Sequence, residues 1–216
     1  MGKKFTNPYI SEMDNYKDII ITEKISNHPV KPFPDTQPLK SIIDIGCGSG
    51  NFLRKYAQNN PDFSFYGFEL RFKRLVKGAI KFKKRDISNI RLIRDRAENI
   101  RDWIKEKSID EIYVNFPDPW AKKKRQLKHR LVTREYLTEL FKLLKPTGHF
   151  IFKTDHPIYF QWTMDRLNIH DHFKVIEYSD DLHQSEYDKA NIPTEFEQLF
   201  KGKGFPVYYI RSIVQP

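Results

Sequence analysis

The feature that most limits the fold of this chain is an apolar segment that stops at three alternating glycines. Residues 41–45 (SIIDI) have the composition of a buried strand, and Gly46, Gly48 and Gly50 follow directly. A helix is expected over residues 51–58. Glycines between a strand and a helix allow the backbone to come close to a bound molecule. The segment therefore predicts a ligand-binding loop at the carboxyl end of a strand.

Strand-like and helix-like segments alternate after this loop. Further strands are expected at residues 63–68, 90–93, 109–116, 149–153, 173–178 and 207–213, and further helices at 71–84, 133–144, 157–167 and 194–201, with a turn at 146–148. This alternation predicts an α/β fold with a doubly wound, seven-stranded, mainly parallel sheet of Rossmann-like type. Residues 38–216 are expected to form one domain. Residues 1–37 contain several prolines and are expected to form a partly ordered N-terminal arm.

Charge is the informative part of the composition. The chain has 38 Lys and Arg against 28 Asp and Glu, a formal net charge of +10. Such a surplus favours a polyanionic partner. The sequence shows no apolar run of membrane-spanning length and no apolar signal region at its start. Cys47 is the single cysteine, so an intrachain disulfide is excluded. We therefore expect a cytoplasmic protein with no membrane partner, as a monomer or weak homodimer.

Two acids stand where a nucleotide-like cofactor would need them. Asp44 lies at the end of the first strand, and Glu69 follows the second strand, 25 residues later (69 − 44). A carboxylate at Glu69 can accept both hydroxyls of an adenosyl ribose, and Asp44 can hold an ammonium group directly or through water. The alternative for Glu69 is an acid favoured by a helix N-terminus. A dinucleotide fingerprint needs glycine at position 51, which is Asn51, so a nucleotide-dependent oxidoreductase is disfavoured. S-adenosylmethionine (AdoMet) is the predicted cofactor.

The segment after the third strand is the expected place for the adenine ring. There, Ala97 and Glu98 can approach the ring through the backbone or the side chain. The alternative is an ordinary turn and helix cap.

The fourth strand ends in Asn115-Phe116-Pro117-Asp118-Pro119-Trp120. Two prolines make a stiff loop that holds the Asp118 carboxylate beside the cofactor position. Asn115 and Asp118 can recognise the edge of a base, and Trp120 offers a flat face for stacking. Asn115 and Asp118 are also expected to contact the cofactor. The alternative is a rigid structural loop. Six Lys or Arg follow between residues 122 and 130, and their closeness to this loop favours phosphate binding over a merely solvated face.

These motifs together resemble those of the bacterial tRNA (guanine-N7)-methyltransferases. The resemblance spans roughly residues 40–213. It is carried by residues 44–52, 66–70, 116–131, 153–155 (KTD) and 194–197 (TEFE). It implies a class I AdoMet-dependent methyltransferase that acts on tRNA, with guanosine 46 of the variable loop as the usual target.

The resemblance also implies roles for particular residues. Cofactor contacts are implied at Asp44, Glu69, Arg96 and Asp118. Substrate contacts are implied at Lys122, Asp155, Thr194, Glu195, Phe196 and Glu197. The chain departs from the family at Arg96, where Asp is common, and at Ala121, where Pro is common.

Other interpretations of the late motifs and of the function remain open. Residues 194–197 also match a helix capping box, and Asp155 is a candidate cap for the helix that starts near Pro157. The histidines show no metal-ligand spacing, and no metal is expected. The proposed reaction needs no base, because guanine N7 already carries a lone pair, and Asp118 would orient the ring and stabilise its positive charge. The alternatives are methylation of an exocyclic amine of RNA and a non-catalytic RNA-binding protein on a methyltransferase fold.

Overall fold

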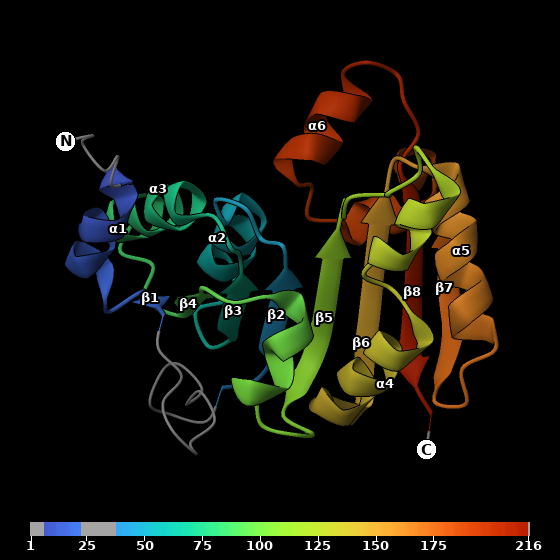
Figure 1. The fold of residues 1–216 in the computed structure, drawn as a ribbon, viewed down its shortest axis with the longest axis horizontal. Coiled ribbons are helices and arrows are strands. Elements are labelled where there is room, and N and C mark those ends of the chain that lie inside the picture. Colours follow the sequence, from blue (N-terminus) through green and yellow to red (C-terminus); the bar gives the residue numbers. More distant parts are fainter. Residues whose placement is uncertain (1–6, 23–37, 216) are drawn as a thin grey trace.

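A twisted, mainly parallel sheet forms the centre of the molecule (Figure 1). The structure, a computed structural model, describes residues 7–22 and 38–215. The strands are β1 (Ile20–Ile21), β2 (Ser41–Ile45), β3 (Ser64–Phe68), β4 (Ile90–Ile93), β5 (Ile109–Asn115), β6 (Leu144–Thr154), β7 (Phe173–Ser179) and β8 (Tyr208–Val214). Their order across the sheet is β1-β4-β3-β2-β5-β6-β8-β7. Strands β1 to β6 pair in parallel, whereas β8 is antiparallel to both β6 and β7.

The α/β prediction is confirmed, but the predicted number of seven strands is one too low. The additional strand, β1, lies in the segment expected to be an arm, and it pairs with β4 through Ile20 and Leu92. A short helix α1 (Pro8–Glu12) and a 3-10 turn η1 (Met13–Tyr16) precede it. The prolines that suggested an arm lie beyond this strand. Residues 1–6 and 23–37 of the expected arm lie outside the described residues, and the domain boundary at residue 38 stays a prediction.

Helices cover both faces of the sheet. The remaining elements are α2 (Asn51–Gln58), α3 (Phe72–Lys83), η2 (Ala97–Asp102), η3 (Lys124–His129), α4 (Arg134–Leu143), α5 (Pro157–Asn168), η4 (Leu182–Gln184), η5 (Glu186–Ala190) and α6 (Glu195–Lys201). Helices α2 and α3 pack with Ile42 of β2 on one face. Helices α4 and α5 pack with the next residue, Ile43, on the other. Because successive strand residues point to opposite faces, the apolar run of β2 contributes to both layers.

The turn predicted at residues 146–148 is instead part of β6. Ile109 pairs with Leu144, and Glu111 pairs with His149, so two steps along β5 oppose five along β6. The extra residues of β6 form an irregularity within the strand rather than a break. A Cβ on Gly148 would lie 3.0 Å from the Lys145 carbonyl oxygen and 3.1 Å from that of Ile109, so glycine fits the crowded backbone here.

The sheet order places a crevice between β2 and β5. From β2 the chain first builds outward through β3 and β4, and it then returns to add β5 on the other side of β2. The loops that follow β2 and β5 therefore turn away from each other. In doubly wound sheets the crevice outside such a switch point is where ligands bind.

Candidate active site

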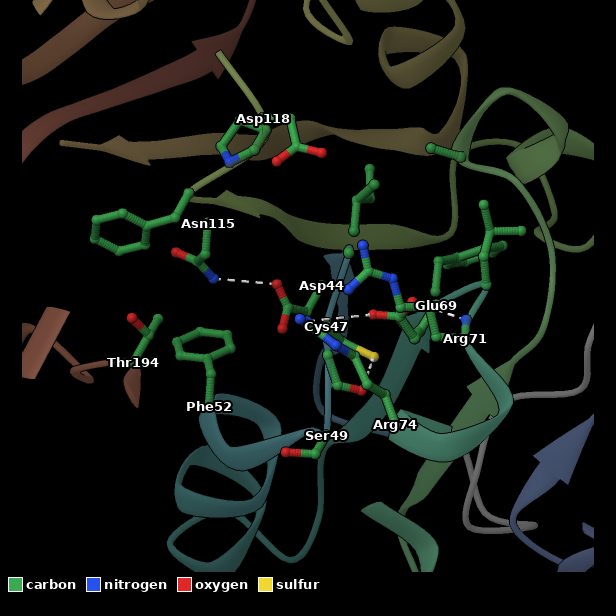
Figure 2. Close-up of a pocket in the computed structure, with 18 of the residues that line it drawn as sticks. Asp44, Cys47, Ser49, Phe52, Glu69, Arg71, Arg74, Asn115, Asp118 and Thr194 are labelled. Carbon is green, nitrogen blue, oxygen red and sulfur yellow. Dashed lines mark hydrogen bonds and ion pairs between the residues drawn. The ribbon is translucent and has the colours of Figure 1, made fainter. Parts of the chain in front are cut away.

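A pocket of about 750 Å³ opens at this switch point (Figure 2). Its walls come from the loops after β2, β3, β4 and β5 and from the start of α6. The predicted site residues that line it are Asp44, Gly46, Gly48, Glu69, Ala97, Glu98, Asn115, Asp118, Thr194, Glu195 and Phe196. Those that do not line it are Gly50, Arg96, Lys122, Asp155 and Glu197. The volume is in the range of small-molecule and cofactor sites.

The glycine loop has backbone angles that glycine adopts readily. Gly46, Gly48 and Gly50 have φ angles of +76°, +59° and +66°, in the left-handed region that side chains disfavour. Gly50 also lacks room, because a Cβ there would lie 2.4 Å from the Cζ atom of Phe82. The loop is fastened to the neighbouring strand by the Gly46 amide, which donates to the Phe68 carbonyl oxygen at 2.8 Å. Gly50 thus lies outside the pocket lining, and its missing side chain lets α2 begin close to α3.

Asp44 is a buried carboxylate at the floor of the pocket. Its side chain is 2% exposed, and its Oδ1 atom accepts a hydrogen bond from Asn115 Nδ2 at 3.1 Å. Burial raises the pKa of Asp44 to about 7, and the Asn115 hydrogen bond and the Lys153 charge offset part of the increase. A carboxylate with so few donors has acceptor capacity left for a cationic group.

Glu69 lies across the loop from Asp44 and is held by α3. Its Oε1 atom accepts from the Arg71 amide at 2.9 Å, and its Oε2 atom lies 3.8 Å from Arg74 Nη1. Glu69 is therefore compatible with both predicted roles, because it lies at the start of a helix and also lines the pocket. Lys73 and Lys77 line the same wall. Sequence reasoning found a basic helix here but did not connect its cations with the pocket.

The adenine side of the pocket differs from the sequence expectation at one position. Arg96 is exposed and is not part of the lining, whereas the preceding residue, Asp95, lines the pocket. The carboxylate of Asp95 accepts from the Arg96 amide at 2.7 Å, from Asn99 Nδ2 at 2.8 Å and from Trp103 Nε1 at 2.7 Å. Asp95 is thus a structural anchor of this wall. The fact that its side chain would bond within its own loop was not visible in the sequence. A cofactor contact by Arg96 stays a prediction.

The loop after β5 is bounded by two residues with left-handed backbone. Phe116 has a φ of +51° and Trp120 a φ of +45°. Neither is glycine, so the surrounding structure must hold both in place. Between them, Asp118 is exposed and lines the pocket. Figure 2 shows Asp118 across the pocket from Ser49 of the glycine loop.

The basic run that follows does not lie wholly at the surface. Lys122, Lys123, Arg125 and Lys128 are exposed, as phosphate contacts require. Arg130 is only 2% exposed, so its predicted place in a phosphate-binding face is wrong. The run ends at a buried position because the chain turns inward toward α4 and α5.

The capping box at the start of α6 is confirmed. The Thr194 hydroxyl accepts from the Glu197 amide at 3.0 Å, and Glu197 Oε2 accepts from the Thr194 amide at 3.2 Å. Glu197 has no exposed surface, and it pairs with Lys153 of β6 at 3.0 Å. Thr194, Glu195 and Phe196 line the pocket, whereas Glu197 ties this wall to the sheet. Its predicted contact with substrate is untested.

Asp155 does not cap α5. The N-cap is His156, whose Nδ1 atom accepts from the Tyr159 amide at 3.3 Å. Asp155 itself is exposed and lies outside the pocket lining, so its predicted substrate contact is also untested.

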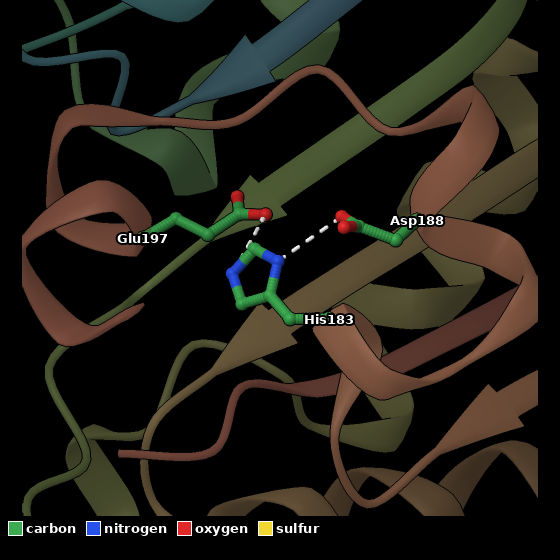
Figure 3. A group of neighbouring side chains, drawn as sticks. All are labelled: His183, Asp188 and Glu197. Carbon is green, nitrogen blue, oxygen red and sulfur yellow. Dashed lines mark hydrogen bonds and ion pairs between the residues drawn. The ribbon is translucent and has the colours of Figure 1, made fainter. Parts of the chain in front are cut away.

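Three ligand-type side chains that are distant in sequence meet beside Glu197 (Figure 3). The His183 ring lies between two carboxylates. Asp188 Oδ1 is 3.0 Å from its Nδ1 atom, and Glu197 Oε1 is 3.6 Å from its Nε2 atom. A cation would compete with the imidazole on both sides and with Lys153, which already occupies Glu197. The cluster is better explained as a hydrogen-bonded and ionic support for α6 than as a metal centre. Within the described ranges, no helix has both the length and the apolar character to cross a membrane.

Comparison with known proteins defines the class and then the family. Residues 39–210 match the model of a family described as putative methyltransferases. A solved 16S rRNA methyltransferase, KamB, is similar in fold, with a TM-score of 0.63 and 16% identity over 86% of this chain and 96% of its own. The doubly wound sheet with its switch-point pocket is accordingly that of a class I methyltransferase.

The curated relatives are more specific. A tRNA (guanine-N(7)-)-methyltransferase of Bdellovibrio bacteriovorus is 34% identical over 78% of this chain and 80% of its own length. A bifunctional glycosyltransferase/methyltransferase of Fusobacterium nucleatum is 44% identical over 74% of this chain, which spans a quarter (25%) of that longer protein. This chain belongs to the tRNA (guanine-N(7)-)-methyltransferase family. The predicted family and the methyltransferase interpretation are confirmed.

Proposed function

We propose that this chain transfers a methyl group from AdoMet to N7 of guanosine in tRNA, with guanosine 46 as the target. The observation that carries the proposal is the position of Asp118. Its exposed carboxylate lines the same pocket as Asp44 and Glu69 and is presented by a loop with two prolines. A group that recognises a base thus adjoins the groups that fit a cofactor.

The residues of the pocket suit AdoMet by their chemistry. When bound, AdoMet supplies an electrophilic methyl group on a sulfonium. Asp44, a buried acceptor with a single side-chain donor, is proposed to hold the ammonium group. Glu69 keeps its Oε2 atom toward Arg74 at 3.8 Å, which is too long for a hydrogen bond, so this oxygen can accept from ribose hydroxyls. The glycine loop, Ala97 and Glu98 also line the pocket and are proposed to contact the cofactor.

The chemical step asks little of the protein besides alignment. Guanine N7 has a free lone pair, so a general base is not required. The product ring is cationic, and the Asp118 carboxylate is proposed to stabilise that charge as it develops. The same carboxylate can accept from the N1–H and amino groups on the guanine edge. Asn115 donates a hydrogen bond to Asp44 and directly precedes the Asp118 loop, so it connects the cofactor side of the pocket to the base side.

The substrate class is supported by charge. Lys122, Lys123, Arg125 and Lys128 are exposed immediately after the Asp118 loop, and the whole chain carries +10. Backbone phosphates of a folded RNA would release counterions on contact with such a surface. A tRNA substrate also fits the proposed cytoplasmic location.

The experiment is a product analysis. The protein is incubated with AdoMet and unmodified tRNA, and the tRNA is digested to nucleosides and analysed by mass spectrometry against 7-methylguanosine and N2-methylguanosine standards. We expect 7-methylguanosine, and mass spectrometry of nuclease fragments of the same tRNA should place it at position 46. Asp118→Ala should lose most of the turnover and keep most of the AdoMet affinity, whereas Asp62→Ala, an exposed acid at the opposite end of β3, should leave both unchanged. An N2-methylated product, or full turnover by Asp118→Ala, would refute the proposal.

A further inference from the structure

Arg130 belongs to the basic run, but the proposed function does not explain why it is buried. It ends the run, but its side chain turns into the protein and is 2% exposed. Its Nε atom donates to the Pro119 carbonyl oxygen at 2.8 Å. Arg130 therefore connects the interior behind α5 to the loop that carries Asp118.

The surroundings of the guanidinium are aromatic. Its Cζ atom lies 4.8 Å from the ring centroids of both Tyr159 and Trp162 on α5. Both rings are fixed in turn by the backbone of Val132, which donates to the Tyr159 hydroxyl at 3.2 Å and accepts from Trp162 Nε1 at 2.9 Å. Cation–π contacts with two anchored rings hold the guanidinium in one orientation.

This burial is not an efficient way to stabilise a fold. The Nη1 and Nη2 atoms of Arg130 are buried and have no hydrogen-bond partner among the described residues. A buried charge with unpaired donors is unfavourable, and an apolar side chain of the same volume often packs as well or better. The position therefore calls for an explanation other than stability.

The loop provides that explanation. The Pro119 carbonyl group belongs to the peptide bond that leads into Trp120, the residue held at a φ of +45°. Pro117 and Pro119 have no amide hydrogen to donate, so the loop has few means of fixing itself. At its start, the Phe116 amide donates to the Lys153 carbonyl oxygen at 2.8 Å. Arg130 supplies the corresponding hold at its end.

We propose that Arg130 is a positioning residue for methyl transfer. Through Pro119 it keeps the Asp118 loop and the Trp120 ring in the geometry that aligns the guanine with the methyl group. This inference depends on the proposed function, because the effect on turnover presupposes that Asp118 contacts the base.

The test compares Arg130→Met with Arg166→Met. Methionine fills the space between the rings without the charge or the bond to Pro119. Arg166 stacks on the same Trp162 ring, 3.1 Å from its centroid, but its Nη1 atom donates to the Trp162 carbonyl oxygen on its own helix rather than to the Asp118 loop. We expect Arg130→Met to keep its melting temperature and AdoMet affinity while kcat falls about 100-fold, the size of effect that a misplacement of roughly 1 Å can cause. Arg166→Met should stay within about twofold of the wild type.

A second measurement is independent of catalysis. Backbone order parameters of Asp118, Trp120 and Ala121, measured by NMR relaxation, should fall in Arg130→Met and stay unchanged in Arg166→Met. Arg130→Lys keeps a charge and a donor but not the planar geometry, so a smaller loss of kcat, about tenfold, is expected. Arg130→Lys replaces Arg130→Met in the same measurements if the methionine variant does not fold.

The proposal is overturned if the order parameters of the loop are unchanged, if kcat stays within twofold of the wild type, or if kcat, stability and AdoMet affinity fall together. If the wild type makes no 7-methylguanosine, the proposed function fails, but the NMR relaxation experiment still decides whether Arg130 orders the loop.

Discussion

Replacing Asp44 with asparagine should make the free protein more stable at pH 8 and should weaken AdoMet binding at the same time. Burial raises the pKa of Asp44 from its usual 3.8 to about 7. Above pH 7 the carboxylate is ionised in both states, but in the folded chain it is buried away from water, whereas in the unfolded chain it is hydrated. Folding therefore becomes less favourable as the pH rises from about 4 to 7 and changes little above that range.

The size of the effect follows from the two pKa values. A difference of about 3 pH units at 1.36 kcal/mol each corresponds to about 4 kcal/mol at pH 8. At pH 5 the carboxyl group is protonated in the folded chain and ionised in the unfolded chain. The destabilisation then depends only on the difference of about 1 unit between pH 5 and the unfolded-state pKa, and it is under about 2 kcal/mol. Asparagine cannot ionise, so Asp44→Asn should raise the free energy of unfolding by more at pH 8 than at pH 5.

Urea unfolding of both proteins at the two pH values measures this difference. Each variant is compared with the wild type at the same pH, so a constant effect of the amide group, such as an altered bond to Asn115, cancels between pH 5 and pH 8. Titration calorimetry at pH 8 should show weaker AdoMet binding by the variant. If its stability gain is the same at both pH values, or if the variant is less stable at pH 8, the assignment of Asp44 as a strained buried acid is wrong.

Three further substitutions test other parts of the site. Glu69→Gln removes the proposed ribose acceptor's charge and should weaken AdoMet binding at least tenfold by calorimetry, since hydrogen bonds to charged groups contribute about 1.5–3 kcal/mol; less than a threefold change would contradict the role. Gly50→Ala puts a Cβ against a buried phenylalanine ring at a φ of +66° and should cost about 2–4 kcal/mol in urea unfolding, and an unfolding midpoint equal to the wild type's would show that the loop relaxes. Lys123→Gln with Lys128→Gln should reduce the slope of log tRNA affinity against log salt by about 1–2 and leave AdoMet binding unchanged; an unaltered slope would place the phosphates elsewhere.

The sequence predicted the sheet well wherever burial had a simple pattern. The mostly apolar run of β2 and the glycines that end it have no other good interpretation, and the strand is buried along its whole length. β1 escaped because two residues are too short to show a period, and only pairing with β4 reveals the strand. The irregular part of β6 was predicted as a turn because Pro146 and Gly148 are turn residues. The strand nevertheless continues through it, because Leu144 and His149 on either side pair with β5.

The site was predictable by residue type more than by contact. Asp44 and Glu69 were found because the ends of parallel strands meet at one edge of the sheet. Arg130 was misjudged because adjacent basic letters look alike in a sequence, and nothing local tells which one turns inward. The ion pair of Glu197 was likewise not predictable, because its partner Lys153 lies 44 residues away in the sequence. Contacts between distant segments decide such cases.

The pairing of β1 with β4 also bears on how this chain avoids self-association. Without β1, the backbone groups of β4 would form an open sheet edge lined by apolar residues, which is a template for pairing with another chain. Ile19 and Ile20 are almost fully buried in the fold, so their removal would also expose the apolar core residues that they cover. A protein shortened to begin at residue 38 should therefore keep every pocket residue and still aggregate, because what it lacks is the strand that closes the sheet.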